Sequence, residues 1–353
     1  MNIDRAHTSD QACRITAQPV VAIVGATGAV GAELLGCLER REFPLRYLRL
    51  LASPRSAGQV MRFRGFQLQV EALDEGSFAD VDLALFSAGS GVSKRYAATA
   101  VKAGAVVVDN SSAFRMDPNV PLVVPEVNAE ALNSHRGIIA NPNCVATIIT
   151  VALAPLHRAR RIRRIHVVTY QSASGAGALA MEELRESTAA FLRDEAYEPK
   201  ILPHPYAFNL FSHNTDIDPE TGYNGEELKV IAETRRIMSL NAPIGITCVR
   251  VPVLRAHAIA LTIEFDEPFP TGEARALLES APGVRVVDDR AANLFPMPSD
   301  ASGGDDVLVG RIRTDLGDPS GRSLTLFAVG DQLLKGAALN AVQIAERLLV
   351  DRT

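Results

Sequence analysis

The sequence lacks the features that mark several classes of protein. It has no tryptophan, four cysteines among 353 residues, and a formal net charge of only −5. No apolar run is long enough to span a bilayer, so we expect no membrane segment. Lysines and arginines are scattered rather than gathered on one face, which argues against a nucleic-acid partner.

The cysteines are too few and too far apart for a disulfide framework. They are Cys13, Cys37, Cys144 and Cys248, and none belongs to a CxxC pair. We therefore expect reduced thiols and a cytoplasmic protein. The polar stretch 1–18 lacks the apolar core of a secretory signal, and its acidic residues argue against a transit peptide, so we expect a flexible extension there.

Residues 19–143 alternate short apolar runs with helical patterns. The sequence predicts strands at 20–25, 45–53, 81–88 and 105–111, and helices at 29–41 and 93–104. Strands and helices that alternate at this spacing indicate βαβ units, and hence a parallel sheet that is covered by helices on both faces. We interpret this part as an α/β domain of Rossmann type.

The pattern changes after Asn143. Helices are predicted at 145–159, 179–195 and 226–240, and strands at 164–172, 245–253, 258–265 and 323–330. The loop at 295–306 is rich in Pro, Gly, Ser and Asp and should be exposed. We interpret 144–330 as a mixed α+β domain. The segment 331–353, with a helix at 331–350, should return to complete the first domain.

A glycine turn follows the first predicted strand. "VVAIVGATGAVGAELL" spaces Gly25, Gly28 and Gly31 as GxxGxxG between a strand and a helix. Glycine permits a tight turn with close backbone approach, and the helix N-terminus presents N–H groups to a pyrophosphate. A tight turn without a ligand is the alternative. We predict a dinucleotide site that includes Gly25, Thr27, Gly28, Ala29 and Val30.

The end of the second predicted strand indicates which dinucleotide binds. An NAD site usually has an acidic residue there, which holds the ribose 2′-hydroxyl. Here "ASPRSAG" offers Ser53, Arg55 and Ser56 and no acid. An arginine and hydroxyls suit a 2′-phosphate, so we infer NADP. Taken alone, Arg55 would be interpreted as a solvated loop charge.

One cysteine, Cys144, follows Asn141-Pro142-Asn143 and precedes a helical run. A thiol at a helix N-terminus should have a lowered pKa and a larger thiolate fraction. Cys37 lies within a helix and Cys248 within a strand of apolar pattern, so position favours Cys144 as a nucleophile. Packing remains the alternative, because free cysteine is commonly buried.

A nucleophilic thiolate requires a base, and seven histidines are available. His257 shares its strand parity with Ile259, Leu261 and Ile263, so it should point with the apolar face. From this periodicity alone, His257 would be a buried and hydrogen-bonded histidine without a catalytic role.

Further polar residues lie where ligands commonly bind. Arg115 follows the carboxyl end of a predicted strand, and Gln171 lies at the end of another, ahead of Ser174 and Gly175. A loop salt bridge is the structural alternative for Arg115, and a flexible hairpin or a helix cap is the alternative for the segment that starts at Gln171. On the predicted helix 226–240, Glu226 and Lys229 share a face, and a surface ion pair is the alternative there.

Taken in order, these segments resemble the aspartate-β-semialdehyde dehydrogenase family. The resemblance covers nearly the whole chain after about residue 19 and rests on "GATGAVG", "FSAGS", "DNSSAFRMD", "VPEVN", "NPNC", "TYQSASGAG", "EELK", "CVRVPVLRAH" and "DQLLKGAA". The insert "FNLFSHNTDIDPETGYN" is similar to one subtype of the family. The resemblance implies reduction of L-aspartyl 4-phosphate by NADPH to the semialdehyde, with release of phosphate. This reaction serves the synthesis of lysine, threonine, methionine and diaminopimelate.

The resemblance also implies catalytic roles. Cys144 would attack the acyl phosphate and form a thioester, which hydride reduces to a thiohemiacetal. His257 would accept the thiol proton and later assist collapse of the thiohemiacetal. Gln171 would orient the reacting group beside the cysteine. The "EELK" and "CVRVPVLRAH" segments would form a pocket for the amino acid.

The resemblance also implies which residues bind each group of the substrate and the cofactor. Arg250 would hold the substrate carboxylate and Glu226 the amino group, while Lys229 and Arg115 would hold the phosphate, with Asn110 nearby. Ser174, Gly175 and Gln332 would line the nicotinamide site. A homodimer through the second domain, possibly a tetramer, is implied by family analogy. We expect no metal.

The sequence departs from the family in one place near the thiol. Residues 145–146 are Val-Ala, where many relatives carry Ser-Thr, and this could remove a hydroxyl near the cysteine.

Two other functions stay open. A reductase of N-acetylglutamyl phosphate would share the fold, but the pocket for a free ammonium argues against it. A non-catalytic paralogue that binds nucleotide or a partner is disfavoured by the presence of Cys144, Gln171, Arg250 and His257.

Overall fold

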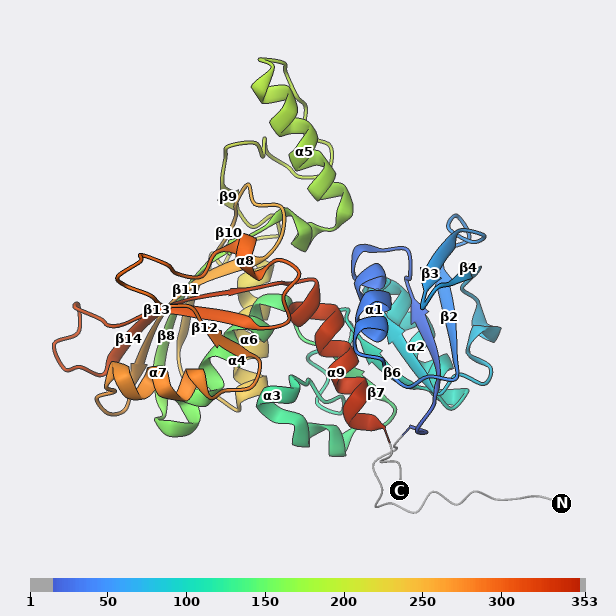
Figure 1. Ribbon diagram of the computed structural model, residues 1–353, viewed down its shortest axis with the longest axis horizontal. Helices are drawn as coiled ribbons and strands as arrows, with labels where there is room; N and C mark the ends of the chain where they lie inside the picture. Colours follow the sequence, from blue (N-terminus) through green and yellow to red (C-terminus); the bar gives the residue numbers. More distant parts are fainter. Residues whose placement is uncertain (1–14, 350–353) are drawn as a thin grey trace.

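A computed structural model describes residues 15–349, which form two lobes, each built on a seven-stranded sheet (Figure 1). The predictions for Cys13 and for positions 1–14 of the extension lie outside the described residues. The last part of the predicted extension is held in place, since the Ile15 N–H donates to Leu348 O at 3.0 Å and Ile15 pairs with Leu349. No helix within 15–349 combines the length and hydropathy needed to cross a membrane.

The first sheet has the strand order β3-β4-β2-β1-β5-β6-β7. Its strands are β1 (Val20–Val24), β2 (Tyr47–Ala52), β3 (Val60–Phe63), β4 (Phe66–Ala72), β5 (Leu83–Phe86), β6 (Val106–Asp109) and β7 (Ile138–Ala140). All neighbours pair in parallel except β3, which turns back antiparallel on β4. β1, β5 and β6 are buried along their whole length, as parallel strands between two helical layers should be.

Helices cover both faces of this sheet. On one face lie α1 (Ala29–Arg40) and the C-terminal α9 (Leu339–Leu348), and on the other lie α2 (Ser90–Lys102) and a 3₁₀ turn (Glu75–Phe78). Alternate residues of β1 serve the two cores, with Val21 and Ile23 facing α1 and α9. The Rossmann-type α/β prediction is confirmed, and Figure 1 shows α9 between the two lobes.

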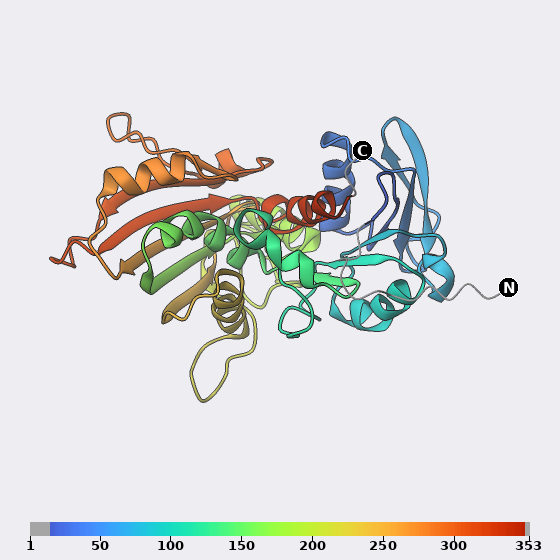
Figure 2. The ribbon, with the colours of Figure 1, turned by 90° about the horizontal axis from the view of Figure 1, so that it is seen from below.

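The second sheet has the order β12-β13-β14-β11-β8-β10-β9. Its strands are β8 (Ile162–Gln171), β9 (Phe211–Ser212), β10 (Ile244–Arg250), β11 (His257–Phe265), β12 (Val284–Val286), β13 (Val307–Thr314) and β14 (Ser323–Gly330). One face packs on α4 (Cys144–Ala159), α6 (Gly225–Met238) and α7 (Thr271–Glu279). Figure 2 shows these helices gathered on one side of the strands. Along β8, buried Ile165 and Val167 alternate with exposed His166, Val168 and Tyr170, so the opposite face is open.

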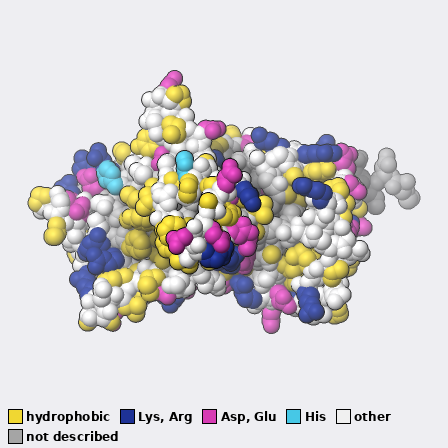
Figure 3. Space-filling model, turned by 90° about the horizontal axis from the view of Figure 1, so that it is seen from above, with side chains coloured by type: hydrophobic (Ala, Val, Ile, Leu, Met, Phe, Trp, Pro, Cys, Tyr) yellow, Lys and Arg dark blue, Asp and Glu magenta, His cyan; other side chains and the backbone are white. Residues whose placement is uncertain are grey.

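The remaining elements are short, apart from one arm. They are α3 (Pro125–Asn128), α8 (Pro298–Ala301) and 3₁₀ turns at Ala129–Ser134 and Ala173–Ala176. The arm is α5 (Ala178–Leu192), which projects from the second lobe in Figure 1. Lysines and arginines are interspersed with aspartates and glutamates on the face shown in Figure 3.

Several element boundaries differ from the predictions. The segment predicted as one helix at 331–350 starts with a π turn (Leu334–Ala338) and is α-helical only in α9. The loop predicted to be exposed at 295–306 contains α8, because Ala301 packs into a small core with Ala258 and Val329. The β3–β4 hairpin and strands β7, β9, β12 and β13 were not predicted.

Candidate active site

A cleft of about 420 Å³ separates the carboxyl edge of the first sheet from the second lobe. Predicted residues that line it are Val30, Asn110, Arg115, Cys144, Gln171, Ser174, Gly175, Glu226, Lys229, Arg250, His257 and Gln332. They come from both lobes and from positions more than 300 apart in the chain. A larger cavity, of about 500 Å³, lies beside the C-terminal ends of α4 and α6 and contains none of them.

Cys144 is the first residue of α4 and lies at the wall of the cleft. Its neighbour Asn143 is the N-cap, and the Asn143 Oδ1 accepts hydrogen bonds from Val145 N at 2.8 Å and Ala146 N at 3.3 Å. The cap satisfies the backbone N–H groups of the first turn, which water cannot reach here. The side chains of Val145 and Ala146 are fully buried in the core beneath the second sheet.

Two glutamates of α6 hold the capping residue. Asn143 Nδ2 donates to Glu226 Oε1 at 2.9 Å, and the Asn143 N–H donates to Glu233 Oε2 at 2.5 Å. Both carboxylates are buried. The thiol is therefore positioned through two hydrogen bonds from α6 to the N-terminus of α4.

The predicted lowering of the Cys144 pKa is wrong for this state of the molecule. Burial raises the pKa of the Cys144 thiol to about 12, and the carboxylate of Glu226 adds to the rise. Arg115, Arg250 and the N–H of the next residue act in the opposite direction without cancelling the effect of burial. The rise in the thiol pKa caused by burial is thus larger than the lowering expected from the N-terminus of α4.

Burial also raises the pKa of Cys37 and of Cys248 to about 12. The direction of the pKa shift therefore does not distinguish the three cysteines that the structure describes. Exposure of the side chain distinguishes them, because Cys144 is partly exposed while Cys37 and Cys248 are buried.

Arg115 lies in the loop after β6 and is held by three groups. Its Nε donates to Asn141 O at 2.9 Å, its Nη2 donates to Asn110 O at 2.7 Å, and its Nη1 contacts Glu233 Oε1 at 3.2 Å. Glu233 therefore links Arg115 to the backbone of Asn143, beside the thiol. The amide of Asn110 is itself engaged, with Nδ2 donating to Phe86 O at 2.9 Å.

Gln171 and Arg250 are direct register partners at the ends of the parallel strands β8 and β10. The Arg250 guanidinium donates from Nη1 to Ser172 O at 3.2 Å, from Nη2 to His213 Nε2 at 2.9 Å, and from Nε to Asn214 Oδ1 at 3.4 Å. Burial lowers the pKa of His213 to about 4, so its ring is neutral and can accept this bond. One N–H on each Nη of Arg250 remains for a ligand.

Glu226 and Lys229 differ in their surroundings although both line the cleft. Glu226 is buried at the start of α6, whereas Lys229 is exposed. No ion pair joins them in the described part of the chain, so the predicted surface-pair alternative does not apply.

His257 opens β11 and is fully buried, as its strand parity predicted. Its Nδ1 lies 3.1 Å from Ser172 N, which donates to it, and 3.0 Å from Ser172 Oγ. Burial, together with Arg250 and His213, lowers the pKa of His257 well below its usual value, so the ring is neutral. Its Nε2 is buried and has no hydrogen-bond partner among residues 15–349.

The glycine turn connects β1 to α1 as predicted. Gly25 has φ +89°, and a Cβ there would lie 2.7 Å from Ser87 O, so no other residue fits without a shift. Gly28 caps α1, and no side chain among residues 15–349 bonds to the free N–H groups of the first turn. Such a cradle suits a pyrophosphate, and Gly25, Thr27, Gly28 and Ala29 would contribute to it, with Val30 at the cleft.

The segment after β2 lies next to this turn. Ser53 and Arg55 are exposed, and Thr27 Oγ1 donates to Ser56 Oγ at 3.3 Å. Arg55 forms no ion pair with a described residue, which leaves its charge available to a phosphate. No group of three or more His, Cys, Asp or Glu residues suited to a metal occurs within 15–349.

Several residues that line the cleft or contact its lining were not singled out from the sequence. Glu233 completes a face of α6 with Glu226 and Lys229 at i, i+3 and i+7, and that periodicity was available. His213 sits in the family-like insert, and Asn143 belongs to the quoted "NPNC" segment. Neither periodicity nor spacing indicates their contacts with Arg250 and Glu226.

Comparison with known proteins gives matches over both lobes. The semialdehyde dehydrogenase NAD binding domain matches residues 20–135, and the semialdehyde dehydrogenase dimerisation domain matches residues 153–335. Aspartate-semialdehyde dehydrogenase of Synechocystis sp. is 56% identical over 333 residues, covering 94% of this chain and 97% of the relative. Its counterpart in Bacillus subtilis is 48% identical, covering 93% of this chain and 96% of the relative.

Solved structures agree with these matches. The crystal structure of aspartate semialdehyde dehydrogenase II from Vibrio cholerae has a TM-score of 0.90 at 44% identity, covering 94% of this chain and 98% of that one. A second structure of the Vibrio enzyme, described as complexed with ASA, also has a TM-score of 0.90. With both domains matched and identities this high over nearly its whole length, this chain belongs to the aspartate-semialdehyde dehydrogenase family.

Proposed function

We propose that this chain catalyses the reversible, NADPH-dependent reductive dephosphorylation of L-aspartyl 4-phosphate to L-aspartate 4-semialdehyde. The reaction would proceed through a thioester on Cys144 and would serve the synthesis of lysine, threonine, methionine and diaminopimelate. The observation that carries the proposal is the meeting of a partly exposed thiol, the Arg250 guanidinium and the Glu226 carboxylate in one cleft. These three groups match the electrophile, carboxylate and ammonium of an aspartyl derivative.

The substrate head group would bind between Arg250 and Glu226. Three partners fix the Arg250 guanidinium and leave one N–H on each Nη, which is the planar fork that a carboxylate prefers. Glu226 uses Oε1 for Asn143 and has Oε2 for the ammonium group. Selection of a free amino acid over an acylated one follows, since acylation removes the ammonium.

The phosphate would bind near Arg115 and Lys229. Arg115 is rigid because three groups hold it, whereas Lys229 is exposed and free to move toward a ligand. Lysine binds phosphate as a mobile point charge, so the two residues suit a group that must first bind and then leave.

The acyl transfer would occur at Cys144. Attack of its sulfur on the acyl carbon breaks the bond to phosphate and leaves a thioester. Displacement of phosphate and reduction by hydride then become two separate steps, each easier than the direct displacement of phosphate by hydride. Gln171, buried at the end of β8 beside Arg250, would orient the reacting carbonyl.

The cofactor site fits a dinucleotide through the cradle at Gly25 and the open first turn of α1. Ser53, Arg55 and Ser56 would meet a 2′-phosphate, and Ser174, Gly175 and Gln332 would border the nicotinamide. When bound, NADPH supplies the hydride for the thioester carbonyl.

An assay of the reverse reaction tests the proposal. We expect NADP reduction by aspartate semialdehyde that requires inorganic phosphate, and none from Cys144→Ala. NAD replacing NADP at equal efficiency would reject the cofactor assignment. Turnover of N-acetylglutamate semialdehyde alone would reject the substrate assignment.

We also propose a homodimer through the second domain. The open face of the second sheet carries Val168, 39% exposed, and Tyr170, 36% exposed, and the matched family model is described as a dimerisation domain. Light scattering should give twice the chain mass of 37.9 kDa. Tyr170→Glu should shift the protein toward monomer, whereas Tyr47→Glu, at an exposed tyrosine of β2, should not. A wild-type monomer would contradict the proposal.

A further inference from the structure

We propose that Arg255 is a positioning residue for hydride transfer. Its guanidinium joins Glu33, on the helix that begins at the dinucleotide cradle, to Asp331, which precedes Gln332. This contact would fix the cofactor site relative to the reacting carbon. The inference rests on the proposed function for the position of the cofactor, and it concerns a residue to which the family resemblance gives no role.

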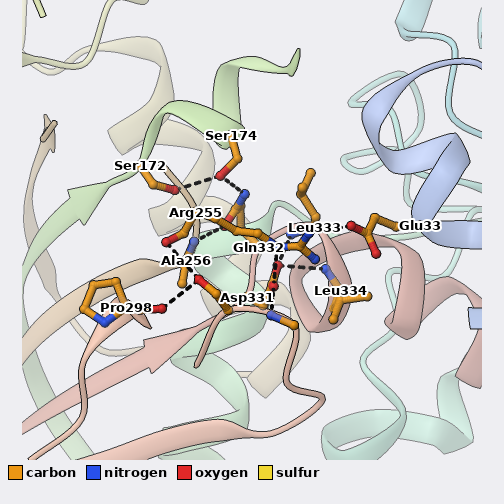
Figure 4. Close-up of polar contacts among 12 residues, drawn as sticks. Glu33, Ser172, Ser174, Arg255, Ala256, Pro298, Asp331, Gln332, Leu333 and Leu334 are labelled. Carbon is orange, nitrogen blue, oxygen red and sulfur yellow. Dashed lines mark hydrogen bonds and ion pairs between the residues drawn. The ribbon is translucent and has the colours of Figure 1, made fainter. Parts of the chain in front are cut away.

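The bridge between the lobes consists of two short ion pairs made by one guanidinium. Arg255 Nε donates to Asp331 Oδ2 at 2.6 Å, and Arg255 Nη1 donates to Glu33 Oε1 at 2.6 Å. Glu33 belongs to the first lobe, whereas Arg255 lies in the second lobe, just before β11. Figure 4 shows Arg255 between the two carboxylates. One side chain therefore connects the two lobes directly.

The bridge is largely withdrawn from water. The side chain of Asp331 is fully buried, while those of Arg255 and Glu33 are 24% and 21% exposed. Ion pairs at a freely exposed surface contribute little, because water competes for both partners. A buried carboxylate that loses its cation is costly, so the pair with Asp331 should keep one geometry. The guanidinium is thus a fixed point to which Glu33 is attached.

On the first lobe the bridge ends near the dinucleotide cradle. Gly28 caps α1, so Glu33 lies in the second turn of this helix. Glu33 is three residues after Val30, on the same face of the helix, and Val30 lines the cleft. The placement of the cradle relative to the second lobe therefore depends in part on the contact with Arg255.

On the second lobe the bridge ends beside Gln332. Asp331 Oδ1 accepts from Leu333 N at 2.9 Å, and Asp331 Oδ2 accepts from Gly303 N at 2.7 Å as well as from Arg255. Gln332 lines the cleft, and the proposed function places it at the border of the nicotinamide site. The carboxylate that pairs with Arg255 thus also fixes the backbone that carries Gln332.

The residue after Arg255 has a strained backbone. Ala256 has φ +72°, a conformation that residues with a Cβ rarely adopt. Its N–H donates to Gln332 Oε1 at 3.0 Å, and Ser302 Oγ donates to the Arg255 carbonyl at 3.3 Å (Figure 4). Such strain persists only where neighbouring contacts hold it, and it is concentrated at functional sites. The turn that leads into His257 is therefore held by the residues that join the lobes.

Hydride transfer is the step that depends on the placement of the two lobes. In semialdehyde oxidation, a hydride leaves the thiohemiacetal carbon for the bound cofactor. The hydroxyl proton goes to His257, in the role that the family resemblance implies, and a thioester remains on Cys144. Because the carbon is attached to the second lobe and the cofactor is held mainly by the first, a small misplacement lowers the rate of this step. Formation of the thiohemiacetal takes place on the second lobe and should be unaffected.

Glu33→Gln removes the charge at the first-lobe end and leaves the pair of Arg255 with Asp331. We expect kcat for NADP reduction by aspartate semialdehyde to fall about tenfold. With substrate deuterated at the aldehyde carbon, the isotope effect on kcat should be at least as large as in the wild type, because hydride transfer is the slowed step. Unchanged kcat, or a lower kcat without an isotope effect, would overturn the proposal.

Glu346→Gln is the matched control. Glu346 pairs with Arg41 at 2.6 Å, next to the end of α1 that is away from the cradle. Its side chain is 28% exposed, compared with 21% for Glu33, so the same charge is lost in similar surroundings. We expect kcat to stay unchanged. An equal fall of kcat in both variants would show a general destabilisation of α1 and would contradict the role of Arg255.

Hydrogen exchange of the ligand-free protein tests the bridge without turnover. In Glu33→Gln we expect faster exchange than in the wild type for peptides that cover 29–36 and 331–336, on the two sides of the lost contact. The rate of Cys144 alkylation should stay unchanged, because α6 positions the thiol through Asn143. Unchanged exchange in both peptides would count against the proposal.

Arg255→Lys tests whether Glu33 acts through Arg255. Lysine keeps a charge beside the buried Asp331 but replaces two separate donor atoms with one point charge. Because both substitutions weaken the same contact, the double variant with Glu33→Gln should lose no more kcat than the more affected single variant. Losses that multiply would show independent effects and overturn the proposal. A wild type that does not oxidise the semialdehyde with NADP would instead reject the proposed function.

Discussion

The proposed site has two halves that are built in different ways. The half on the first lobe is the dinucleotide cradle next to the cleft, which it meets at Val30, and it consists of a glycine turn, the N-terminus of α1 and the largely exposed Ser53–Ser56 segment. The half from the second lobe consists of buried polar side chains such as Gln171, Arg250 and His257, each held by neighbours. Backbone groups in an open turn can still bind a ligand after substitution of nearby side chains. A buried polar side chain, in contrast, loses its contact with a ligand when its position shifts by a small distance. Substitutions in the second half should therefore have the larger effects.

The largest effect should come from Cys144→Ala. Loss of the nucleophile should lower kcat/KM about 10⁴-fold or more, because the thioester route is removed. NADP binding, measured by calorimetry, should stay unchanged, since the cofactor cradle lies in the other lobe. Activity within tenfold of the wild type would contradict the role of Cys144.

The second largest loss of activity should come from Arg250→Lys. The charge is kept but the planar fork is lost, and we expect kcat/KM for aspartate semialdehyde to fall about 10²-fold. Arg285→Lys, at an exposed arginine of β12 in the same sheet, should have no effect. A loss of less than threefold in Arg250→Lys would show that the carboxylate binds elsewhere.

The rate of alkylation of Cys144 should report its raised pKa. Because the pKa is about 12 in the ligand-free protein, the thiol form predominates at neutral pH and the thiolate fraction rises as pH rises. We expect the rate with iodoacetamide to increase about tenfold per pH unit between about pH 7 and about pH 10, followed by mass spectrometry. The buried Cys37 provides the control and should react far more slowly. A plateau near neutral pH would mean that the thiolate is already formed.

Gly175→Ala should have a moderate effect. The added methyl would lie 2.9 Å from the His257 ring and 3.0 Å from Arg250, so one of them must move. We expect kcat/KM to fall about tenfold. Gly91→Ala in α2 is the matched control, because a Cβ there meets nothing within 4 Å. Equal activity of both variants would mean that the site can rearrange.

The smallest effect should come from the first half, in Arg55→Ala. An exposed arginine that meets a 2′-phosphate contributes modestly, so the KM for NADP should rise about threefold to tenfold while kcat stays unchanged. The KM for NAD should not change. An equal rise in the KM for both cofactors would show that Arg55 does not contact the 2′-phosphate.

The sequence was most informative where local pattern and chemistry coincide. The strand, turn and helix around Gly25 follow from chain-local periodicity, as does the buried orientation of His257. The contacts of Asn143 with Glu226 and Glu233 could not be predicted, because 83 and 90 positions separate the partners and nothing in the sequence pairs them.

The sign of the Cys144 pKa shift was wrong for a related reason. The helix N-terminus is visible in the sequence, but the depth of burial that outweighs it depends on packing between distant elements. The "NPNC" segment thus identified the position of the thiol but not its protonation in the ligand-free state.

The return of α9 to the first sheet has a consequence for synthesis of the chain. On the ribosome, the hydrophobic face formed by α1 and β1 emerges before the second lobe, yet the helix that covers it is translated after that lobe. A nascent chain ending before Leu339 would leave that surface uncovered. The core of the first lobe can therefore close only after the second lobe has been synthesised, and its apolar face is exposed to aggregation in the meantime.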